Sequence, residues 1–351
     1  METTMGIIWS ISEVPTGAVA DLLGKKPTLF LAFLLQALGI GFLASAQQYN
    51  HLLIGVSIAG LGGALSSGTI EALVYDTLKQ WKKEKTYSTV LARMTFLQLA
   101  TPAAASIIGG YLYTIYPRLP FILHASMYAI GTILTLFLTE PLIDSIKFSL
   151  KNFLSQTTKG MQQLFVSDDI RTQTIVLLSI GGIVVIFEEM LNNFLGVEFG
   201  YKEHELGVIW AIISIIGALA AQSSPWIHKN LKLKRAYIIL GCIIAITAIM
   251  SPWIGIILGS ITIVIRYASA MILGNLTSIA INERTPSAYR ATTLSTFNMI
   301  KGIPYVLLAW IVGSAADIYT ARIIACILGG ILLLLLMFQS SLLFMKRDKH
   351  H

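Results

Sequence analysis

Eleven apolar segments divide this chain, and they constrain its fold more than any other feature of the sequence. A helix needs about 20 apolar residues to cross a bilayer core, and the segments approach or exceed that length. A helix is the expected form of each segment, because a strand exposed to lipid leaves its backbone groups without hydrogen-bond partners. The sequence therefore predicts an all-α polytopic membrane protein with spans at 4–23, 27–46, 51–77, 88–115, 119–139, 173–197, 206–226, 235–250, 253–281, 291–316 and 320–345.

Composition and charge placement support this topology. Hydrophobic residues make up 55% of the chain and charged residues only 12%, whereas about a quarter of a soluble domain is charged. Nineteen Lys and Arg residues fall in alternate loops and in the tail, three fall in the opposite loops, and three lie within spans. The richer side is cytoplasmic by the positive-inside rule, so we predict a multi-pass protein of the cytoplasmic (inner) membrane with a cytoplasmic C-terminus. The net charge of +7 thus reflects topology, and we predict no nucleic-acid partner.

A basic connector separates two groups of spans. The expected domains are an N-terminal bundle at 1–140, a cytoplasmic amphipathic connector at 141–172 and a C-terminal bundle at 173–351. The connector has apolar residues near helical spacing, opposite two lysines, and is expected to lie on the membrane surface. These residues are Ile143, Ile146, Leu150, Phe153 and Leu154, opposite Lys147 and Lys151.

A weak internal repeat relates the two groups of spans. A shift of 204 residues places Gly109 on Gly313 and Arg118 on Arg322. The same shift places the counterpart of the helix near Gln173 before Met1. Many secondary transporters are built from such parallel repeats. We therefore expect two pseudo-symmetric bundles with 11 of 12 helices present and the first helix missing.

The strongest local motif lies in the first loop. Gly17, Asp21 and Gly24 form a Gly-x-x-x-Asp-x-x-Gly pattern followed by Lys25 and Lys26. Gly17 allows close helix approach, Gly24 permits a tight reversal, and Asp21 can sit near a helix N-terminus or a basic partner. The pattern resembles the signature loop between the second and third helices of the major facilitator superfamily. In that family the loop is a latch between the two halves in one access state. The alternative is a solvated loop with ordinary positive-inside lysines.

Two other segments resemble the same family. Residues 67–79 look like the end of the fourth helix in bacterial members, and residues 281–295 look like the loop between the tenth and eleventh helices. Two departures limit the comparison. Val56 occupies the position of an Arg frequent in helix four, and Ala105-Ser106 replace the Gly-Pro typical of drug–proton antiporters. Antiport is therefore a hypothesis.

The resemblance implies a secondary active transporter that moves a small molecule by alternating access, through proton-coupled efflux of an amphipathic compound. The cavity would be lined by helices beginning near residues 51, 173 and 253. We expect a monomer with no cofactor, no metal and no enzymatic activity. Two alternatives stay open: a polytopic membrane protein without coupled transport, such as a lipid-handling enzyme or sensor, and a non-functional truncated transporter.

Ionisable residues within spans are costly unless they are paired or face water. Glu188 and Glu189 are such residues, and at helical spacing Glu188 shares a stripe with Asn192, and Glu189 with Asn193. Arg266 lies near the middle of another span. We hypothesise that Arg266 pairs with one glutamate in one access state and exchanges it for a proton or substrate in another. The alternative is a permanent structural ion pair.

Five further charged residues are candidates for coupling or structure. Glu13 lies beside a proline in the first span and could titrate, while Lys301 either follows a polar interface or faces the cavity. Glu71, Asp76 and Arg93 lie near the cytoplasmic ends of adjacent spans. We predict that these three form a static ion cluster, with a role in gating as the alternative.

Overall fold

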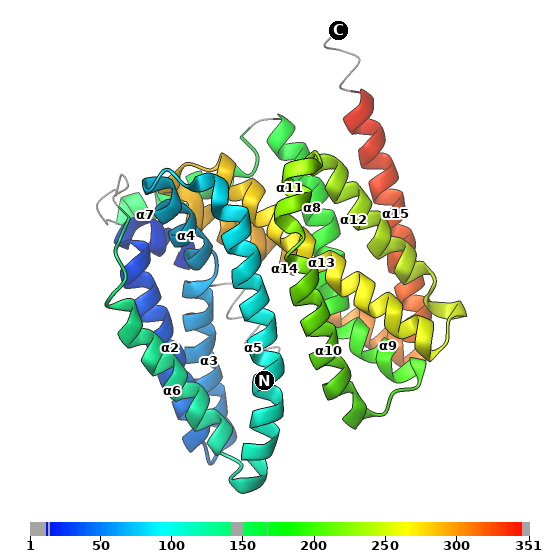
Figure 1. Cartoon of the computed structure of the whole chain (residues 1–351), viewed down its shortest axis with the longest axis horizontal. Helices are drawn as coiled ribbons and strands as arrows, with labels where there is room; N and C mark the ends of the chain where they lie inside the picture. Colours follow the sequence, from blue (N-terminus) through cyan, green and yellow to red (C-terminus); the bar gives the residue numbers. More distant parts are fainter. Residues whose placement is uncertain (1–11, 13–14, 142–149, 167, 346–351) are drawn as a thin grey trace. The chain divides into compact units, whose positions relative to one another are not determined.

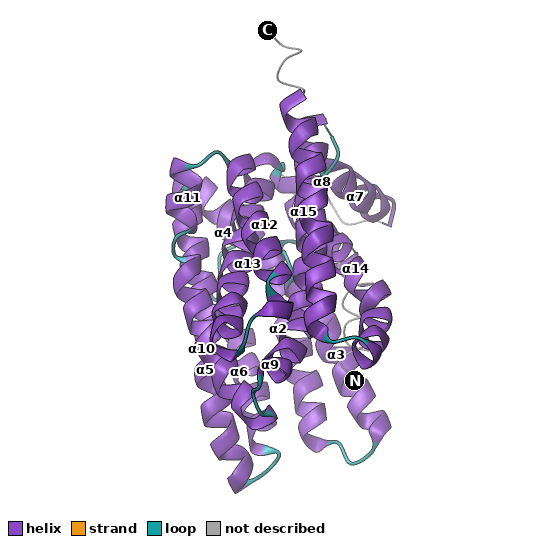
Figure 2. Ribbon diagram, turned by 90° about the vertical axis from the view of Figure 1, so that its right-hand side faces the viewer, coloured by secondary structure: helices purple, strands orange, loops and turns teal. Residues whose placement is uncertain are grey.

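The structure is a computed structural model that describes residues 12, 15–141, 150–166 and 168–345. Glu13 and the connector residues 142–149 lie outside this part of the chain. The described residues form helices joined by short loops and contain no strand (Figure 2). Seven helical segments in this part are long and apolar enough to cross a membrane: Lys25–Ser45, Tyr49–Gln80, Gln173–Phe199, Val208–Asn230, Leu233–Trp253, Ile256–Arg284 and Ala321–Gln339.

The chain divides into two compact units, and each consists of more than one stretch of sequence. The first comprises Met1–Tyr87, Ile107–Val166 and Ala280–Met299, and the second comprises Ser88–Ser106, Ser167–Ile279 and Ile300–His351. Residues 88–106, expected in the N-terminal bundle, belong to the second unit. Residues 280–299, expected in the C-terminal bundle, belong to the first. The expected boundaries at residues 140 and 172 stay a prediction.

The first unit contains most of the N-terminal helices (Figure 1). It includes helical residues 15–23, α2 (Lys25–Ser45), α3 (Tyr49–Ser66), α4 (Thr69–Gln80), η1 (Glu84–Thr86), α6 (Leu119–Thr135), α7 (Leu150–Gln163) and η4 (Ser287–Tyr289). The predicted span 51–77 consists of two helices, α3 and α4, joined at Gly68 with φ 69°. Glycine is favoured there because other residues rarely adopt left-handed backbone.

Small residues bring α2 and α3 into backbone contact. A Cβ atom on Gly39 of α2 would lie only 2.5 Å from the Ala59 nitrogen of α3, and one on Gly62 of α3 would lie 2.6 Å from the Ala32 oxygen of α2. Small residues at helix interfaces are the usual means of close packing in a bilayer, where apolar side chains gain little by leaving lipid.

The second unit contains most of the C-terminal helices: α8 (Asp168–Ile186), the π-helical turn η2 (Phe187–Leu191), α9 (Asn192–Phe199), α10 (Glu203–Ala221), α11 (Ser224–Asn230), α12 (Leu233–Ile249), η3 (Ser251–Trp253) and α15 (Ala321–Met345). The helices α5 (Tyr87–Ile115), α13 (Ile256–Arg284) and α14 (Arg290–Ile318) contribute to both units. Gly329 of α15 packs against α12, since its Cβ would lie 2.7 Å from the Ala245 oxygen.

Candidate functional site

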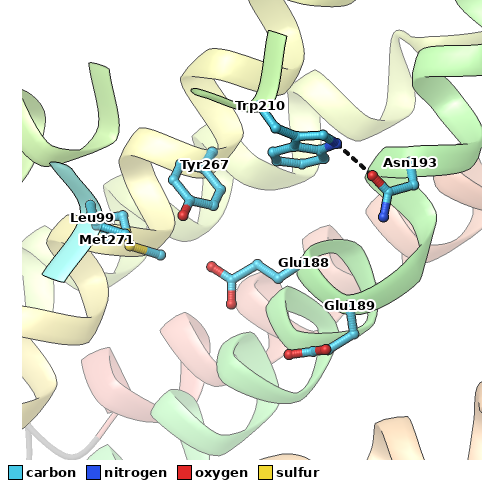
Figure 3. Close-up of a pocket in the computed structure, with 7 residues that line it drawn as sticks. All are labelled: Leu99, Glu188, Glu189, Asn193, Trp210, Tyr267 and Met271. Atoms are coloured by element: carbon cyan, nitrogen blue, oxygen red, sulfur yellow. Dashed lines mark hydrogen bonds between the residues drawn. The ribbon is translucent and has the colours of Figure 1, made fainter. Parts of the chain in front are cut away.

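A cavity of about 410 Å³ lies within the second unit (Figure 3). Its wall combines two acidic residues, one amide, two aromatic rings and two apolar side chains. These are Glu188, Glu189, Asn193, Trp210, Tyr267, Leu99 and Met271. The cavity therefore joins a carboxylate pair to an aromatic and apolar surface, and Glu189 and Asn193 on its wall are exposed.

The acidic residues reach the cavity from a π-helical turn. Glu188 and Glu189 lie within η2, which separates α8 from α9. The wider turn changes the register, so Asn193 lines the cavity with Glu188, while Asn192 is buried and faces Arg266. Of the two pairs that α-helical spacing predicted, Glu189 and Asn193 both line the cavity, whereas Glu188 lines it without Asn192. Such π-helical turns are frequent at functional sites.

The aromatic wall is fixed by three contacts. Trp210 and Tyr267 meet edge to face, with ring centroids 6.0 Å apart and an interplanar angle of 67°. The indole Nε1–H of Trp210 donates a hydrogen bond of 2.5 Å to Asn193 Oδ1. The Tyr267 ring packs against Gly217 of α10, where a Cβ atom would lie 2.7 Å from Cε1 of the ring. Sequence reasoning missed both aromatic residues, because nothing in a single helix distinguishes a cavity-facing ring from a lipid-facing one.

Arg266 is buried beside the π-helical turn, with 2% of its surface exposed. Its Nε and Nη2 atoms donate hydrogen bonds of 3.2 and 2.9 Å to Asn192 Oδ1, and its guanidinium lies 4.7 Å from the centroid of the Phe187 ring. Nη1 has no hydrogen-bond partner among the described residues. Arg266 therefore contacts both ends of η2. The structure gives it an amide partner where the hypothesis named a glutamate.

Glu188 is the more shielded of the two acidic residues. Its Oε1 atom is buried and has no hydrogen-bond partner in the described part of the chain, whereas Glu189 is exposed. Lys301 of α14 attracts the Glu188 carboxylate, and Glu189 repels it. The aliphatic stem of Lys301 crosses Gly181 of α8, where a Cβ would lie 2.8 Å from Cγ of Lys301. Lys301 thus offsets part of the negative charge at the cavity.

The predicted signature loop forms a second cluster, within the first unit. Asp21 accepts hydrogen bonds from the backbone nitrogens of Ala291 and Thr292, at 3.2 and 2.9 Å, and from Thr292 Oγ1 at 2.8 Å. These groups lie at the N-terminus of α14, where backbone N–H groups and the helix dipole favour an anion. Gly17 allows this approach, because its Cβ would lie 2.8 Å from Thr292 Cα.

Asp76 is the centre of a buried charge network in the same unit. It is fully buried, pairs with Lys25 Nζ at 3.0 Å, forms an ion pair with Arg290, and accepts a hydrogen bond of 2.7 Å from Ser287 Oγ. Lys25 also approaches Asp21 at 3.8 Å. Arg290 was missed as a site residue, although it lies in the segment that resembles the family.

The three residues of the expected ion cluster do not all belong to the same unit. Glu71 and Asp76 lie in the first unit and Arg93 in the second. The ion pairs that the structure gives to Asp76 go to Lys25 and Arg290. A cluster of Glu71, Asp76 and Arg93 therefore stays a prediction, with other partners for Asp76 in the described conformation.

Glu140 contacts the signature loop, and Gln156 contacts the segment just before α14; neither contact was expected from the sequence. Glu140 accepts hydrogen bonds from the backbone nitrogens of Lys25 and Lys26, at 2.7 and 2.6 Å, and so caps the first turn of α2. Gln156 of the connector helix α7 donates to the Ala288 oxygen. Both contacts join residues more than 100 positions apart, which local spacing cannot reveal.

The chain belongs to the Major Facilitator Superfamily, whose family model matches residues 2–309. This match confirms the predicted family and the all-α polytopic fold class. A solved structure supports the same fold: the human organic anion transporter MFSD10 (TETRAN) superposes with a TM-score of 0.77 at 16% identity, covering 96% of this chain and 82% of that one.

Curated relatives match parts of the chain. The multidrug resistance protein MdtL of Shewanella sp. (strain ANA-3) is 22% identical over 237 residues, which cover 67% of this chain and 57% of that protein. The multidrug resistance protein MdtH of Sodalis glossinidius (strain morsitans) is 31% identical over 96 residues, 27% of this chain and 22% of that protein. The chain thus spans less than two thirds of the length of either relative.

Proposed function

We propose that this chain is a secondary transporter that moves a small amphipathic molecule across the cytoplasmic membrane by alternating access, through proton-coupled efflux. The observation that carries this proposal is the cavity with Glu188 in its wall, inside a bundle of membrane-spanning helices. An ionisable residue at such a position is costly and marks a substrate or proton path in membrane proteins. The names of MdtL and MdtH, both multidrug resistance proteins, agree with an export role.

Glu188 is proposed as the group that exchanges a proton for substrate. Its buried oxygen without a hydrogen-bond partner is poorly stabilised as an anion, and protonation or a bound cation would relieve that cost. The Glu188 carboxylate is attracted by Lys301 and repelled by Glu189, and its charge in turn acts on the hydroxyl group of Tyr267. Arg266 would serve as an alternative partner of the acidic pair in another access state. Replacing Arg266 with Met is expected to change transport or proton coupling, and no change in either would remove it from the mechanism.

Asp21 is proposed to act as a gate through its contact with the N-terminus of α14. The contact consists of three hydrogen bonds to a charged group, each worth about 1.5–3 kcal/mol before mutual dependence is considered. A contact of this strength can be broken and remade within a transport cycle. Lys25, buried between Asp21 and Asp76, is proposed to hold this gate closed, and the loop that carries Lys25 and Lys26 is proposed to lie on the cytoplasmic side.

The test is a flux assay in proteoliposomes that contain the purified chain. A panel of positive, neutral and negative fluorescent dyes is loaded, a pH gradient is imposed in either direction, and dye and proton movement are recorded together. Gradient-driven dye movement with a matching proton flux, lost in Glu188→Gln and kept in Glu84→Gln, is expected. Glu84 is an exposed residue of η1 and serves as the matched control. Dye movement that equals that of empty liposomes for the whole panel would refute the proposal.

A further inference from the structure

We propose that Asn193 selects the guest of the cavity, because its side-chain amide offers an N–H donor to a carbonyl or ether oxygen on an aromatic compound. This inference rests on the proposed function, since it names the substrate class of the same cavity. It depends on the orientation of one amide group, on the wall around it and on the size of the space.

Trp210 fixes the orientation of the Asn193 amide. The indole nitrogen of a tryptophan only donates hydrogen bonds, whereas an asparagine amide carries an acceptor oxygen and a donor nitrogen. The bond of 2.5 Å from Trp210 Nε1 therefore ends on Asn193 Oδ1, and Nδ2 is directed away from the indole. Figure 3 shows Nδ2 on the side of Asn193 that faces Glu188 and Glu189. Because Asn193 lines the cavity, its donor is directed into this space.

The donor of Asn193 is available to a guest. Nδ2 makes no hydrogen bond to any residue that the structure describes, and the side chain is exposed. A guest that enters displaces the water that hydrates this group, and an N–H left without an acceptor costs free energy. A guest with a carbonyl or ether oxygen restores the hydrogen bond, whereas a guest of the same shape without that oxygen does not. Sites that hydrogen-bond their substrates discriminate in this way.

The other polar groups of the described lining do not supply an equivalent donor. The two carboxylates only accept hydrogen bonds in their ionised form. The hydroxyl group of Tyr267 is paired with Ser214, and the N–H of Trp210 is engaged by Asn193. Among the described lining residues, Asn193 therefore supplies a donor that has a fixed direction and is not already used.

The remaining wall suits an aromatic ring. Trp210 and Tyr267 meet edge to face, and Met271 and Leu99 add an apolar surface. Contacts between aromatic rings, and between a methionine sulfur and a ring, stabilise a complex beyond the burial of area. Tyr267 packs against Gly217, and Trp210 is held by its hydrogen bond. The wall is thus positioned before a guest arrives, which reduces the entropy lost on binding.

The volume limits the size of the guest. A space of about 410 Å³ falls within the range of roughly 300–1,000 Å³ that is typical of small-molecule sites. The combination predicts a compact aromatic ketone, amide or ether whose oxygen accepts the hydrogen bond from Asn193.

The test compares two rigid probes of the same shape, fluorenone and fluorene, which differ by a carbonyl group in place of a methylene group. Binding of each probe to the full chain in detergent is measured by equilibrium dialysis against protein-free micelles. The readout is the ratio of fluorenone affinity to fluorene affinity. Because one neutral hydrogen bond separates the probes, this ratio should be about three- to tenfold higher in the unaltered chain than in Asn193→Leu. Asn50→Leu, at an exposed position of α3, is the matched control and should leave the ratio unchanged.

A second variant keeps the inference testable should Asn193→Leu impair folding. Trp210→Phe retains an aromatic ring but removes the N–H that fixes the amide, and its ratio should lie between those of the unaltered chain and Asn193→Leu. A purely structural role of Asn193 would lower both affinities together and leave the ratio unchanged. An unchanged ratio in Asn193→Leu or in Trp210→Phe, or binding of neither probe, would overturn the inference.

Dye flux in proteoliposomes separates this inference from the proposed function. Gradient-driven flux that is lost in Glu188→Gln, together with an unchanged ratio in Asn193→Leu, would refute the inference alone. A ratio that falls as expected, with dye movement equal to that of empty liposomes, would refute the proposed function alone.

Discussion

Gly17→Ala is the most direct test of the contact between the signature loop and α14. The added Cβ would lie 2.8 Å from Thr292 Cα and 2.9 Å from the Ala291 oxygen. Both are backbone atoms, so neither can move away by rotating a side chain. Carbon atoms in contact rest about 3.5–4.0 Å apart, and the helix that carries Gly17 must therefore shift by about 0.7 Å or more.

The magnitude follows from the contacts that this shift disturbs. Asp21 lies one turn further along the same helix, on the same face, and its hydrogen bonds to Ala291 and Thr292 lengthen when the helix moves. Overpacking costs about 1–3 kcal/mol, and each weakened hydrogen bond to a charged group adds to that cost. Replacing Gly by Ala within a helix returns up to about 1 kcal/mol. The expected net loss of unfolding free energy is about 1–3 kcal/mol.

The assay is unfolding in mixed micelles by titration with sodium dodecyl sulfate, followed by circular dichroism. Gly41→Ala in α2 is the matched control, because its Cβ would meet only Ala125 Cβ at an ordinary 3.9 Å. The control should keep or gain stability, whereas Gly17→Ala should lose it. Equal gains in both variants would show that the close approach of Gly17 to α14 does not exist in the protein.

Three further predictions test the charge network and the cavity. Arg290→Met leaves Asp76 buried with one cation fewer and should cost about 3–5 kcal/mol of unfolding free energy. The double variant Arg290→Met with Asp76→Asn should cost at least about 1 kcal/mol less than the sum of the two single changes, and additive costs in the mixed-micelle titration would refute the pairing. Gly217→Ala should displace the Tyr267 ring and slow gradient-driven dye flux in proteoliposomes by about tenfold without loss of helix content, and an unchanged flux would contradict this position of the ring. Deletion of Met190 should convert η2 to α-helix and abolish gradient-driven dye flux with an unchanged circular dichroism spectrum, whereas retained flux would show that the π register is not required.

The sequence predicted the family, the helical fold and the position of Asp21 from local information. The glycine spacing around Asp21 allowed two partners, a helix N-terminus or a basic residue, and the structure has both: the start of α14 and Lys25 at 3.8 Å. Spacing within one segment reveals which residues need a close neighbour. It does not reveal which distant segment supplies that neighbour, so Arg290 and Glu140 were not expected at this place.

The cavity shows the same limit more clearly. Glu188 and Glu189 were expected to matter because a carboxylate in a membrane helix is costly. Of the two pairs predicted from α-helical spacing, Glu189 and Asn193 both line the cavity, whereas Asn192, the predicted partner of Glu188, binds Arg266 beside η2. Arg266 of α13 contacts Phe187 and Asn192 at the two ends of η2, and a helix pattern read along the chain does not contain such contacts.

The sequence by itself determined that this chain crosses a membrane as helices, since lipid leaves an exposed backbone no other way to satisfy its hydrogen bonds. It also determined the positions of the glycines and of the charged residues within the predicted spans. Only the tertiary structure decided which charges meet, how η2 turns its acidic residues, and which rings form the wall beside them. The physical reason is range: solvation by lipid acts on each segment separately, whereas pairing and packing depend on residues that the fold brings together from distant parts of the chain.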